Sequence, residues 1–541
     1  MGDKPHRRNF MTVRISVSSA KEAYSVIADV ARTNRDEVGA AIVQILSGLE
    51  ASALAPRTLF EIAEVLRASG EDAVAEYRSG YTDRALPLGE AEARRFGHAM
   101  ALLHAFETMY QRVFETALAA RSDDPARQDL ARPLQRCMAC LVSQMIEHYR
   151  ARQSVGLAPW KRLQERMQAA NREKLDAVVV PDPLNPRGAI TTLATYGRAL
   201  LLSIAQADAM THRNLEATLT LTALFAHLLE SAMLDKNEGA GNARPRGGIA
   251  GVEIKRAGRI RVVVAGGVTH LVNTTKIDGA LNWCMQRLAE GDSPEQIGLA
   301  TVARADLAGL LPRLRRIWCG AGDIRESERQ PRQEQSAVAI GFREIYEFAS
   351  PGPPVIPREF DVYDASPEVS YGKSARMPIF NQQANPVESW QILDLSASGM
   401  RATRSQPGAR LRRGQLLAVG SKHMEKRSGF ALAEVRWLQQ VTDSEAGGIA
   451  AGVQFVSLYA EVALVRVFGL VPGQYQTIGP AFVLVQSTPN QMVLPSGWFA
   501  PGRKVDLWYK ERVSPVELTD LQARGADYEI VGYKPADKEI R

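Results

Sequence analysis

The feature that most constrains the fold is a change of hydrophobic period across residues 235–251. Before this stretch, apolar residues recur at three- and four-residue spacing, which is typical of helices that pack through one face. After it, most apolar segments are short and are bounded by glycine, proline and polar residues, as strands are. The stretch itself, DKNEGAGNARPRGGIAG, is glycine-rich, polar and unpatterned, which is typical of a linker. The sequence therefore predicts a multidomain α+β protein with an all-α N-terminal part.

The N-terminal part carries several helical patterns and a clear helix start. The segments with the clearest pattern are Ala99–Ala117, Leu134–Met145, Arg198–Leu202 and Leu215–Leu234. Ser19 and Glu22 have the spacing of a capping box, which predicts an earlier helix through about Arg32. The alternating segment Thr12–Val17 predicts a short strand before it. We expect six to eight helices packed as an irregular bundle.

A smaller mixed module follows the linker. Its predicted elements are a hairpin of Val252–Lys255 and Arg259–Val264 turning at Ala257 and Gly258, a helix at Lys276–Leu288, a helix start at the capping box Ser293–Gln296, and a helix at Ala305–Ile317. The last helix ends in a basic run with Arg313, Arg315 and Arg316. This run either helps to bind an anionic ligand or complements the negative end of the helix dipole.

These patterns divide the 541 residues into successive parts. We predict an N-terminal segment (1–40), a helical domain (41–235), the linker (236–251), the α/β module (252–320), an antiparallel β-barrel (325–470) and a C-terminal β extension (471–541). The extension is predicted from three strands, Ala481–Gln486, Val505–Tyr509 and Glu529–Tyr533. We expect it to pack on the barrel, with Trp498 and Trp508 as anchors.

The stretch Trp390–Thr403, WQILDLSASGMRAT, predicts two strands joined by a tight polar turn. Its D-x-S-x-x-G pattern is formed by Asp394, Ser396 and Gly399. Three apolar segments follow at strand length: Leu416–Val419, Phe430–Trp437 and Ala451–Leu458. The pattern alone fits a hairpin with side-chain-bonded turns. The pattern followed by these three strand-length segments is a more specific signal than the pattern alone.

This series resembles the PilZ domain family, small β-barrels that bind cyclic di-GMP. The resemblance lies in the D-x-S-x-x-G motif, the V-R-W at the end of Phe430–Trp437 and the G-V-Q-F within Ala451–Leu458. It covers about residues 325–470. It implies that Asp394 accepts the two donors of a guanine edge, that Ser396 bonds a phosphate or base edge, and that Gly399 admits backbone close to the ligand or a positive φ.

The family's second motif is R-x-x-x-R, just before the first barrel strand. Arg325 and Arg329 have this spacing, and Arg332 lies nearer to the predicted first strand, Ser336–Phe348. If Arg332 fills the second arginine position, the first would fall on Glu328, so two registers remain open. Arginine forks suit phosphates and guanine N7 and O6. The alternative interpretation of this arginine-containing segment is a solvated charged linker without a ligand.

A long insert separates the predicted first strand from Trp390, where the family has a short hairpin. This insert, about 349–388, is rich in proline and polar residues, and we expect a loop over the barrel mouth. It departs from the family pattern, as the arginine register does.

Other features exclude several functional classes. Cys137 and Cys140 form a CxxC inside a helical apolar run without a second pair, so we expect buried thiols rather than a zinc or redox site.

The scattered histidines lack metal-ligand spacing, and no nucleotide-loop or hydrolase motif is present, so we predict no enzyme, metal or cofactor. No apolar stretch of 18 residues and no secretory signal occur, so we expect a cytoplasmic protein without direct membrane insertion.

The leading hypothesis is a cytoplasmic cyclic di-GMP receptor that signals through its helical domain to a protein partner not identified by sequence. The alternative is a degenerate barrel that binds no nucleotide and serves as a protein-interaction scaffold. A nucleic-acid-binding role rests only on the net charge of +6, and no aromatic platform among basic residues supports it. We therefore predict no nucleic-acid partner.

Overall fold

The computed structural model describes residues 16–120, 127–234, 244–246, 249–254, 259–263, 269–320, 330–350, 387–420, 430–441, 448–470, 476–485, 487 and 489–536. These form two compact units. The first holds the chain up to Arg84 and from Leu88 through the last long helix before residue 320. The second holds the three residues Ala85–Pro87 and the described strands from residue 330 onward.

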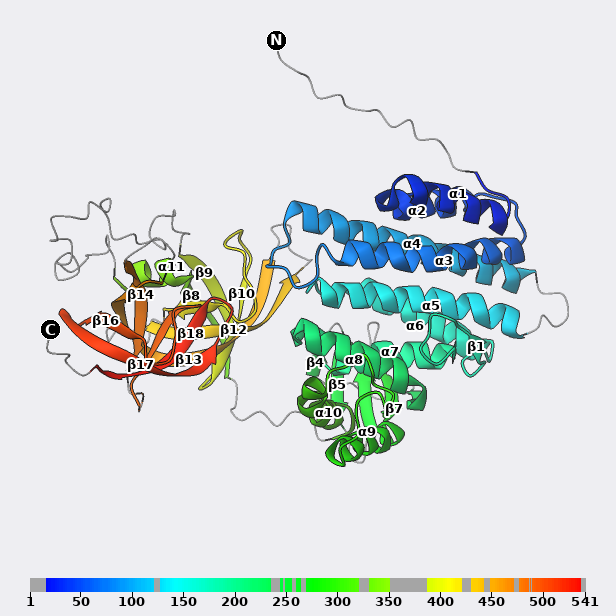
Figure 1. Ribbon diagram of the computed structural model, residues 1–541. Coiled ribbons are helices and arrows are strands. Elements are labelled where there is room, and N and C mark those ends of the chain that lie inside the picture. The colour runs from blue at the N-terminus through cyan, green and yellow to red at the C-terminus, as the bar shows by residue number, and fades with distance from the viewer. Residues whose placement is uncertain are drawn as a thin grey trace, which may run out of the picture. The chain divides into compact units, whose positions relative to one another are not determined.

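The first unit begins with the predicted helical bundle (Figure 1). Its helices are α1 Ala20–Thr33, α2 Val38–Leu49, α3 Pro56–Arg78, α4 Glu90–Ala119, α5 Arg127–Arg150, α6 Leu157–Arg172, α7 Thr192–Ile204 and α8 His212–Phe225, with a two-residue pairing of β1 Val180–Pro181 and β2 Ala189–Ile190. The Ser19 hydroxyl accepts the N–H of Glu22 at 3.3 Å, which confirms the predicted start of α1. The apolar faces of α1–α4 share one core and those of α5–α8 another.

The mixed module continues the first unit. Its sheet has the antiparallel order β3-β7-β6-β5-β4, from β3 Glu230–Leu234, β4 Arg244–Arg246, β5 Ile249–Ile254, β6 Arg259–Val263 and β7 Thr269–Asn273. Helices α9 Thr275–Ala289 and α10 Arg304–Cys319 follow. They share the apolar core of α5–α8, and the indole of Trp318 donates to the carbonyl of Leu201 at 2.9 Å. The module therefore packs as part of the helical unit.

Two predictions for this unit were wrong. The helix predicted over Leu215–Leu234 ends at Phe225, and Glu230–Leu234 is instead strand β3, which pairs with β7. The capping-box bonds of Ser293 and Gln296 form, at 2.7 and 3.4 Å, but the chain makes only turns there. Capping is a local interaction, and the chain leaves the helical conformation at Gly298, whose φ is 76°, so no helix follows. The strand predicted at Thr12–Val17 and the turn at 257–258 lie largely or wholly outside the described residues.

The second unit contains a closed six-stranded antiparallel barrel, as predicted. Its strands are β8 Gln330–Ile340, β9 Glu388–Ser396, β10 Gly399–Arg404, β11 Leu416–Val419, β12 Phe430–Val441 and β13 Gly448–Phe468. They run in the order β10-β9-β8-β11-β12-β13, and β13 closes the ring on β10. The motif hairpin β9–β10 is thus one side of this first ring (Figure 1).

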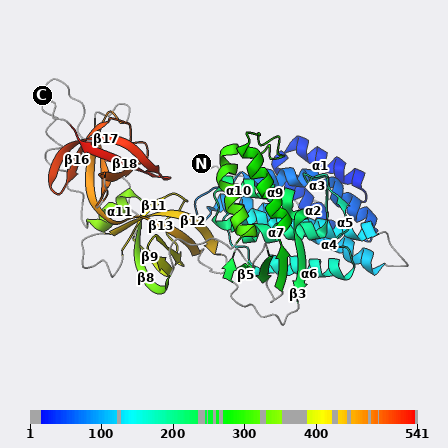
Figure 2. The same ribbon diagram turned by 90° about the horizontal axis from the view of Figure 1, so that it is seen from below.

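The C-terminal strands close a second ring on the same long strand. They are β14 Gln476–Leu484, β15 Gln491–Pro495, β16 Lys504–Tyr509, β17 Arg512–Arg524 and β18 Tyr528–Pro535. Their order is β13-β14-β15-β18-β17-β16, and β16 pairs back to β13 (Figure 2). The first ring uses Ile449–Gln454 of β13 for closure, and the second uses Leu464–Arg466. Trp498 is buried in the second ring's core, and the side chain of Trp508 packs near Leu464.

The segment predicted as one strand, Ser336–Phe348, is a strand followed by a helix. Strand β8 ends at Ile340, and helix α11 spans Phe342–Ala349. Gly341 separates them with a φ of 108°, a conformation that disfavours residues with a side chain. Residues 342, 345 and 346 then have helical spacing, and their side chains are buried between the strands of the two rings. The predicted insert falls mainly on 351–386, outside the described residues.

No helix in the described part of the chain is long and apolar enough to cross a membrane. The thiols of the CxxC lie in the helical core, as predicted, since Cys137 is fully buried. Burial raises the pKa of Cys137 to about 12 and that of Cys140 well above its ordinary value. Both thiols therefore stay protonated at neutral pH, which disfavours redox or metal chemistry.

The two rings meet at a carboxyl group. Asp527, in the turn between β17 and β18, accepts the N–H of Leu416 in β11 at 2.9 Å. In the same turn, the N–H of Ala526 donates to the carbonyl of Gly414 at 2.6 Å. Burial raises the pKa of Asp527 from 3.8 to about 6, despite the N–H of Leu416 that favours the ionised form. Because the pKa is higher in the folded than in the unfolded chain, the folded unit loses stability as the pH rises from about 4 to about 6, and the loss stays constant above that.

We expect Asp527→Asn to stabilise the second unit at pH 7.5 by up to about 2 kcal/mol, because the amide oxygen still accepts the Leu416 N–H and carries no charge. Below about pH 3 the carboxyl is protonated in both folded and unfolded chains, so the advantage should vanish. Urea unfolding followed by tryptophan fluorescence measures this. The exposed Asp520→Asn variant is the control, and an equal gain at both pH values would contradict the assignment.

Candidate functional site

The predicted motif forms the hairpin β9–β10. Ser396 and Gly399 are direct backbone partners at its tip, so residues 397 and 398 make the turn. The Ser396 hydroxyl donates to the carbonyl of Gly399 at 3.0 Å, and its oxygen lies 3.4 Å from that of Ser398. Asp394 lies two residues from the tip, directly opposite Arg401. The structure thus places the three predicted motif residues at one end of one hairpin.

Asp394 already has a cationic partner. Its Oδ2 lies 2.9 Å from Nε of Arg401, whose side chain is 47% exposed while that of Asp394 is only 13% exposed. The carboxylate therefore orients a guanidinium whose Nη atoms have no hydrogen bond among the described residues. Sequence reasoning missed Arg401. The pairing of Ser396 with Gly399 across a two-residue turn would have identified it, since this register sets 394 opposite 401.

Three β-bulges lie beside this pair. The pairing of β8 with β9 shifts between Pro331 and Glu334, that of β9 with β10 shifts between Arg401 and Ala402, and that of β12 with β13 shifts between Val435 and Trp437. A bulge adds one residue to one strand and turns the following side chains to the other face. Bulges of this kind re-aim side chains and are common next to functional sites.

The bulges align one row of residues across five strands. Pro331, Asp394, Arg401, Gly452 and Trp437 are successive direct partners on β8, β9, β10, β13 and β12. Direct partners in antiparallel strands point to the same face. Neighbouring Met400, Ala402, Val435 and Val453 are buried inside the ring, so the row faces outward. We call these five residues the outer row.

Gly452 leaves room within the outer row for an aromatic ring. A Cβ at this position would lie 1.9 Å from the indole nitrogen of Trp437, so the indole lies across the glycine. On the other side of Gly452, the direct partner is Arg401. The V-R-W and G-V-Q-F segments thus meet the D-x-S-x-x-G hairpin in space. Arg436, the residue at the β12 bulge, is 49% exposed and pairs with Glu434 at 3.0 Å.

Gly399 has a structural role that differs from the predicted one. Its φ is not positive, and a Cβ would lie 2.2 Å from the carbonyl oxygen of Val453 in β13. The close approach predicted for a ligand is therefore already made by the strand that closes the ring. The turn is fixed there too, since the N–H of Phe455 donates to the carbonyl of Ser398 at 2.9 Å.

Of the three predicted arginines, only Arg332 is described. It lies at the bulge of β8, is exposed, and donates from Nη2 to Oε1 of Gln330 at 3.3 Å. Because Pro331 is the direct partner of Asp394, Arg332 is brought next to the outer row. Arg325 and Arg329 lie outside the described residues, so the choice between the two registers stays open.

A cavity of about 380 Å³ lies at the same end of the first ring. Its lining is mostly apolar and consists of Gln330, Glu334, Ile392, Leu395, Ser396, Ala397, Met400, Val419, Ala431, Phe455 and Leu458. The charged side chain in this lining is an acid, Glu334. The cavity is therefore unsuited to a phosphate, whereas the outer row has Arg401 with Arg332 and Arg436 beside it.

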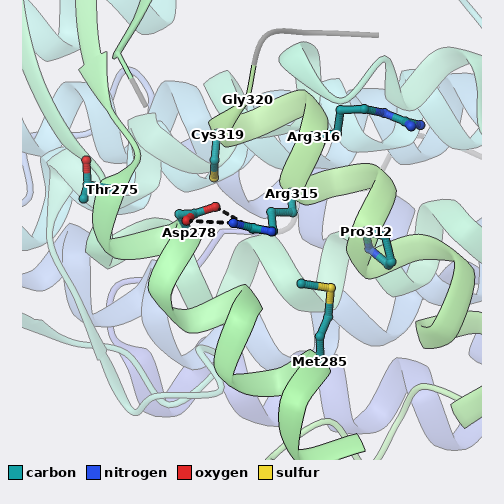
Figure 3. Close-up of a pocket in the computed structure, with 8 residues that line it drawn as sticks. All are labelled: Thr275, Asp278, Met285, Pro312, Arg315, Arg316, Cys319 and Gly320. Carbon is teal, nitrogen blue, oxygen red and sulfur yellow. Dashed lines mark hydrogen bonds and ion pairs between the residues drawn. The ribbon is translucent and has the colours of Figure 1, made fainter. Parts of the chain in front are cut away.

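A second cavity, of about 600 Å³, lies between α9 and α10 in the first unit (Figure 3). It includes two residues of the basic run, Arg315 and Arg316. Arg315 donates from Nε and Nη2 to the two carboxylate oxygens of Asp278, at 2.8 and 3.3 Å. Arg316 extends away from this pair. The carboxylate of Asp278 offsets the charge of Arg315, so we assign no ligand to this cavity.

The described residues contain no cluster of three or more His, Cys, Asp or Glu side chains that could hold a metal ion. The outer row has a carboxylate, a guanidinium and an indole, but it has no nucleophile paired with a base. This arrangement can bind an anionic, aromatic ligand through ion pairs and stacking.

Comparison with known families bears on the first unit. Residues 21–234 match the family described as the N-terminal domain of the cyclic-di-GMP receptor FimW. The matched region runs from α1 to β3 and covers less than half of the chain. The match does not extend to the rings. Comparison with curated protein sequences found no match.

The packing of Gly399 gives a stability prediction. Gly399→Ala places a methyl group against the carbonyl of Val453, and we expect it to destabilise the second unit by about 2 kcal/mol or more. Gly97→Ala, in α4 with no heavy atom within 4 Å of the new Cβ, should instead be neutral or slightly stabilising. Thermal unfolding of both variants tests this. An unchanged midpoint for Gly399→Ala would contradict the close contact with β13.

Proposed function

We propose that this protein is a cyclic di-GMP receptor that binds its ligand on the outer row of the first ring. The observation that carries the proposal is the convergence of three separate sequence motifs on that row. Asp394 comes from the first, Trp437 from the second and Gly452 from the third. The family match of the helical region to a cyclic di-GMP receptor supports the same ligand independently.

Arg401 is the proposed anchor for a phosphate or a guanine. Asp394 holds its Nε, so the two Nη groups can donate as a fork. A fork of this kind fits two oxygens of a phosphate or the N7 and O6 of guanine. Arg332 and Arg436 flank the row at bulges, and Arg325 and Arg329 remain proposed ligands from the sequence motif. The ligand has two phosphates, so more than one arginine is needed.

Trp437 is the proposed stacking surface for one guanine. Its indole is partly exposed and lies against Gly452, which has no side chain, and we propose that a base stacks on the exposed part of the ring. Stacking of a base on an aromatic side chain contributes about 1–3 kcal/mol. Ser396, at the tip of the same hairpin, is the proposed hydrogen-bond partner of a second polar group on the ligand.

The receptor acts through binding and not through catalysis in this proposal. The helical unit is the proposed output part, which presents a surface to a protein partner. The sequence-based expectation of a cytoplasmic protein belongs to the same proposal. No metal or cofactor is part of it.

One observation favours the alternative, a scaffold without nucleotide. Asp394 is already paired with Arg401, and Glu434 with Arg436, so two candidate arginines have internal partners. Both arginines are about half exposed, however, and such pairs contribute little to stability. They can therefore change partner when a doubly charged ligand arrives.

Calorimetric titration of the full chain with cyclic di-GMP tests the proposal. We expect binding at micromolar concentration or below, weakened about five- to 150-fold by Arg401→Ala and about five- to 150-fold by Trp437→Ala. Asp394→Ala should weaken binding less than Arg401→Ala, since it removes the group that orients the fork.

The matched control is Arg412→Ala, an exposed arginine of the same ring outside the row, which should bind as the wild type does. Absence of binding by folded wild-type protein would favour the scaffold. Binding unaffected by all three row variants would place the ligand elsewhere.

A further inference from the structure

A short segment from the N-terminal half of the chain belongs to the second unit. Ala85–Pro87 lies between α3 and α4 in sequence, yet it packs with the first ring. The N–H of Leu86 donates to the carbonyl of Leu411 at 2.8 Å, and the N–H of Leu411 donates back to Leu86 at 2.7 Å. This reciprocal pair is an antiparallel bridge, the smallest unit of strand addition.

The side chain of Arg410 binds the backbone of the same segment. Its Nε donates to the carbonyl of Pro87 at 3.0 Å, and its Nη2 donates to the carbonyl of Ala85 at 2.8 Å. Leu86 and Leu411 are both almost fully buried. Four hydrogen bonds therefore hold three residues, and we call the residues Arg410 and Leu411 the clamp.

The loop that carries the clamp is tied to the open end of the motif hairpin. Glu388, the first residue of β9, accepts from Arg404 Nη1 at 2.8 and 2.7 Å and from the N–H of Ala409 at 2.6 Å. Arg404, the last residue of β10, also donates to the carbonyl of Ala409 at 3.0 Å. The side chains of Glu388 and Arg404 are buried, and Trp390 donates to Glu388 at 2.8 Å.

Buried charges of this kind hold their geometry closely, because removing either partner leaves the other uncompensated. The residue next to the clamp, Ala409, is bonded on both sides of its backbone by this ion pair. Gly408 fits here because a Cβ would lie 2.3 Å from the Glu388 carboxylate. The clamp is therefore positioned by the two outer ends of β9 and β10.

The same two strands carry the proposed ligand site at their other end. The tip of the hairpin is at Ser396 and Gly399, and the ion pair of Glu388 with Arg404 closes its base. Ser396 lies eight positions after Glu388 in β9, and eight steps along a strand span about 26 Å. One continuous two-stranded ribbon thus joins the outer row to the clamp.

From this arrangement we infer that the clamp couples the outer row to the chain segment between α3 and α4, and that ligand on the outer row tightens the hold of the clamp on Ala85–Pro87. The inference rests on the proposed function. A ligand that bridges Arg401 and Trp437 restrains the hairpin against β12 and β13. Restraint at one end of a ribbon lowers the entropy cost of ordering the other end. Since Ala85–Pro87 joins α3 to α4, its release or retention reaches the helical unit along the chain.

Hydrogen–deuterium exchange of the full chain, with and without saturating cyclic di-GMP, measures this coupling. The reporters are the N–H groups of Leu86 and Leu411, which are the bonded donors of the bridge. We expect exchange at both to slow about fivefold or more with ligand, in line with ordinary coupling free energies. Unchanged or faster exchange in protein shown by calorimetry to be saturated would overturn the inference and leave the proposed function intact.

Arg410→Ala tests the clamp without touching the outer row. Arg410 is exposed, so its loss should not unfold the ring. Without ligand, we expect exchange at Leu86 to become about fivefold faster or more. With ligand, linkage requires that a loosened clamp also weakens cyclic di-GMP binding, by up to the same factor.

Arg412→Ala, two residues away and exposed, is the control for both measurements. If Arg410→Ala leaves exchange at Leu86 as in the wild type, the clamp is not what holds the segment and the inference fails. If the wild-type protein binds no cyclic di-GMP by calorimetry, the proposed function fails first, and the coupling fails with it.

Discussion

Both rings of the second unit close on one strand, β13, and the rest of that unit depends on this shared closure. The strand is 21 residues long, and its two halves pair with β10 and with β16. A closed ring leaves no exposed strand edge, so each ring satisfies its own backbone donors and acceptors. Sharing the strand fixes the two rings in one unit. Closure against β10 needs close backbone contact, and Gly399 provides it.

The same closure creates the outer row. With β10 paired to β13, and β13 paired to β12, Arg401 and Trp437 become neighbours across Gly452. The bulges on β8, β9 and β12 turn the polar members of the row outward and keep the apolar residues beside them inside. The fold therefore gathers a guanidinium and an indole on one face, although they are 36 residues apart in the sequence. Ion pairing with the first and stacking on the second are the interactions that a cyclic dinucleotide offers.

Much of the fold could be predicted from the sequence, because it follows local patterns. Strand β11 has the predicted bounds Leu416–Val419, and the predicted helix Lys276–Leu288 lies within α9 with one extra residue at each end. Helix α11 was not predicted, because a short apolar segment fits both the helix and the strand period, and only Gly341 marks the break between β8 and α11. The closing of two rings on β13 depends on pairing between distant residues, which no local pattern contains.

The arrangement of the candidate site was predictable in part. Asp394, Ser396 and Gly399 were correctly placed together, because a hairpin is local. The position of Arg401 opposite Asp394 follows from the register of that hairpin, but the sequence analysis did not identify Arg401. Trp437 could not be assigned, since its place on the row depends on the bulge at Arg436 and on the ring closure.

The most direct test of the central claim is a crystal structure of the full chain with cyclic di-GMP bound. We predict one guanine over the Trp437 indole and a phosphate or guanine edge on the Nη groups of Arg401, with the hairpin β9–β10 in the arrangement described. Ligand in the cavity of about 380 Å³ at the end of the first ring, or on the helical unit, would contradict the outer row as the binding surface.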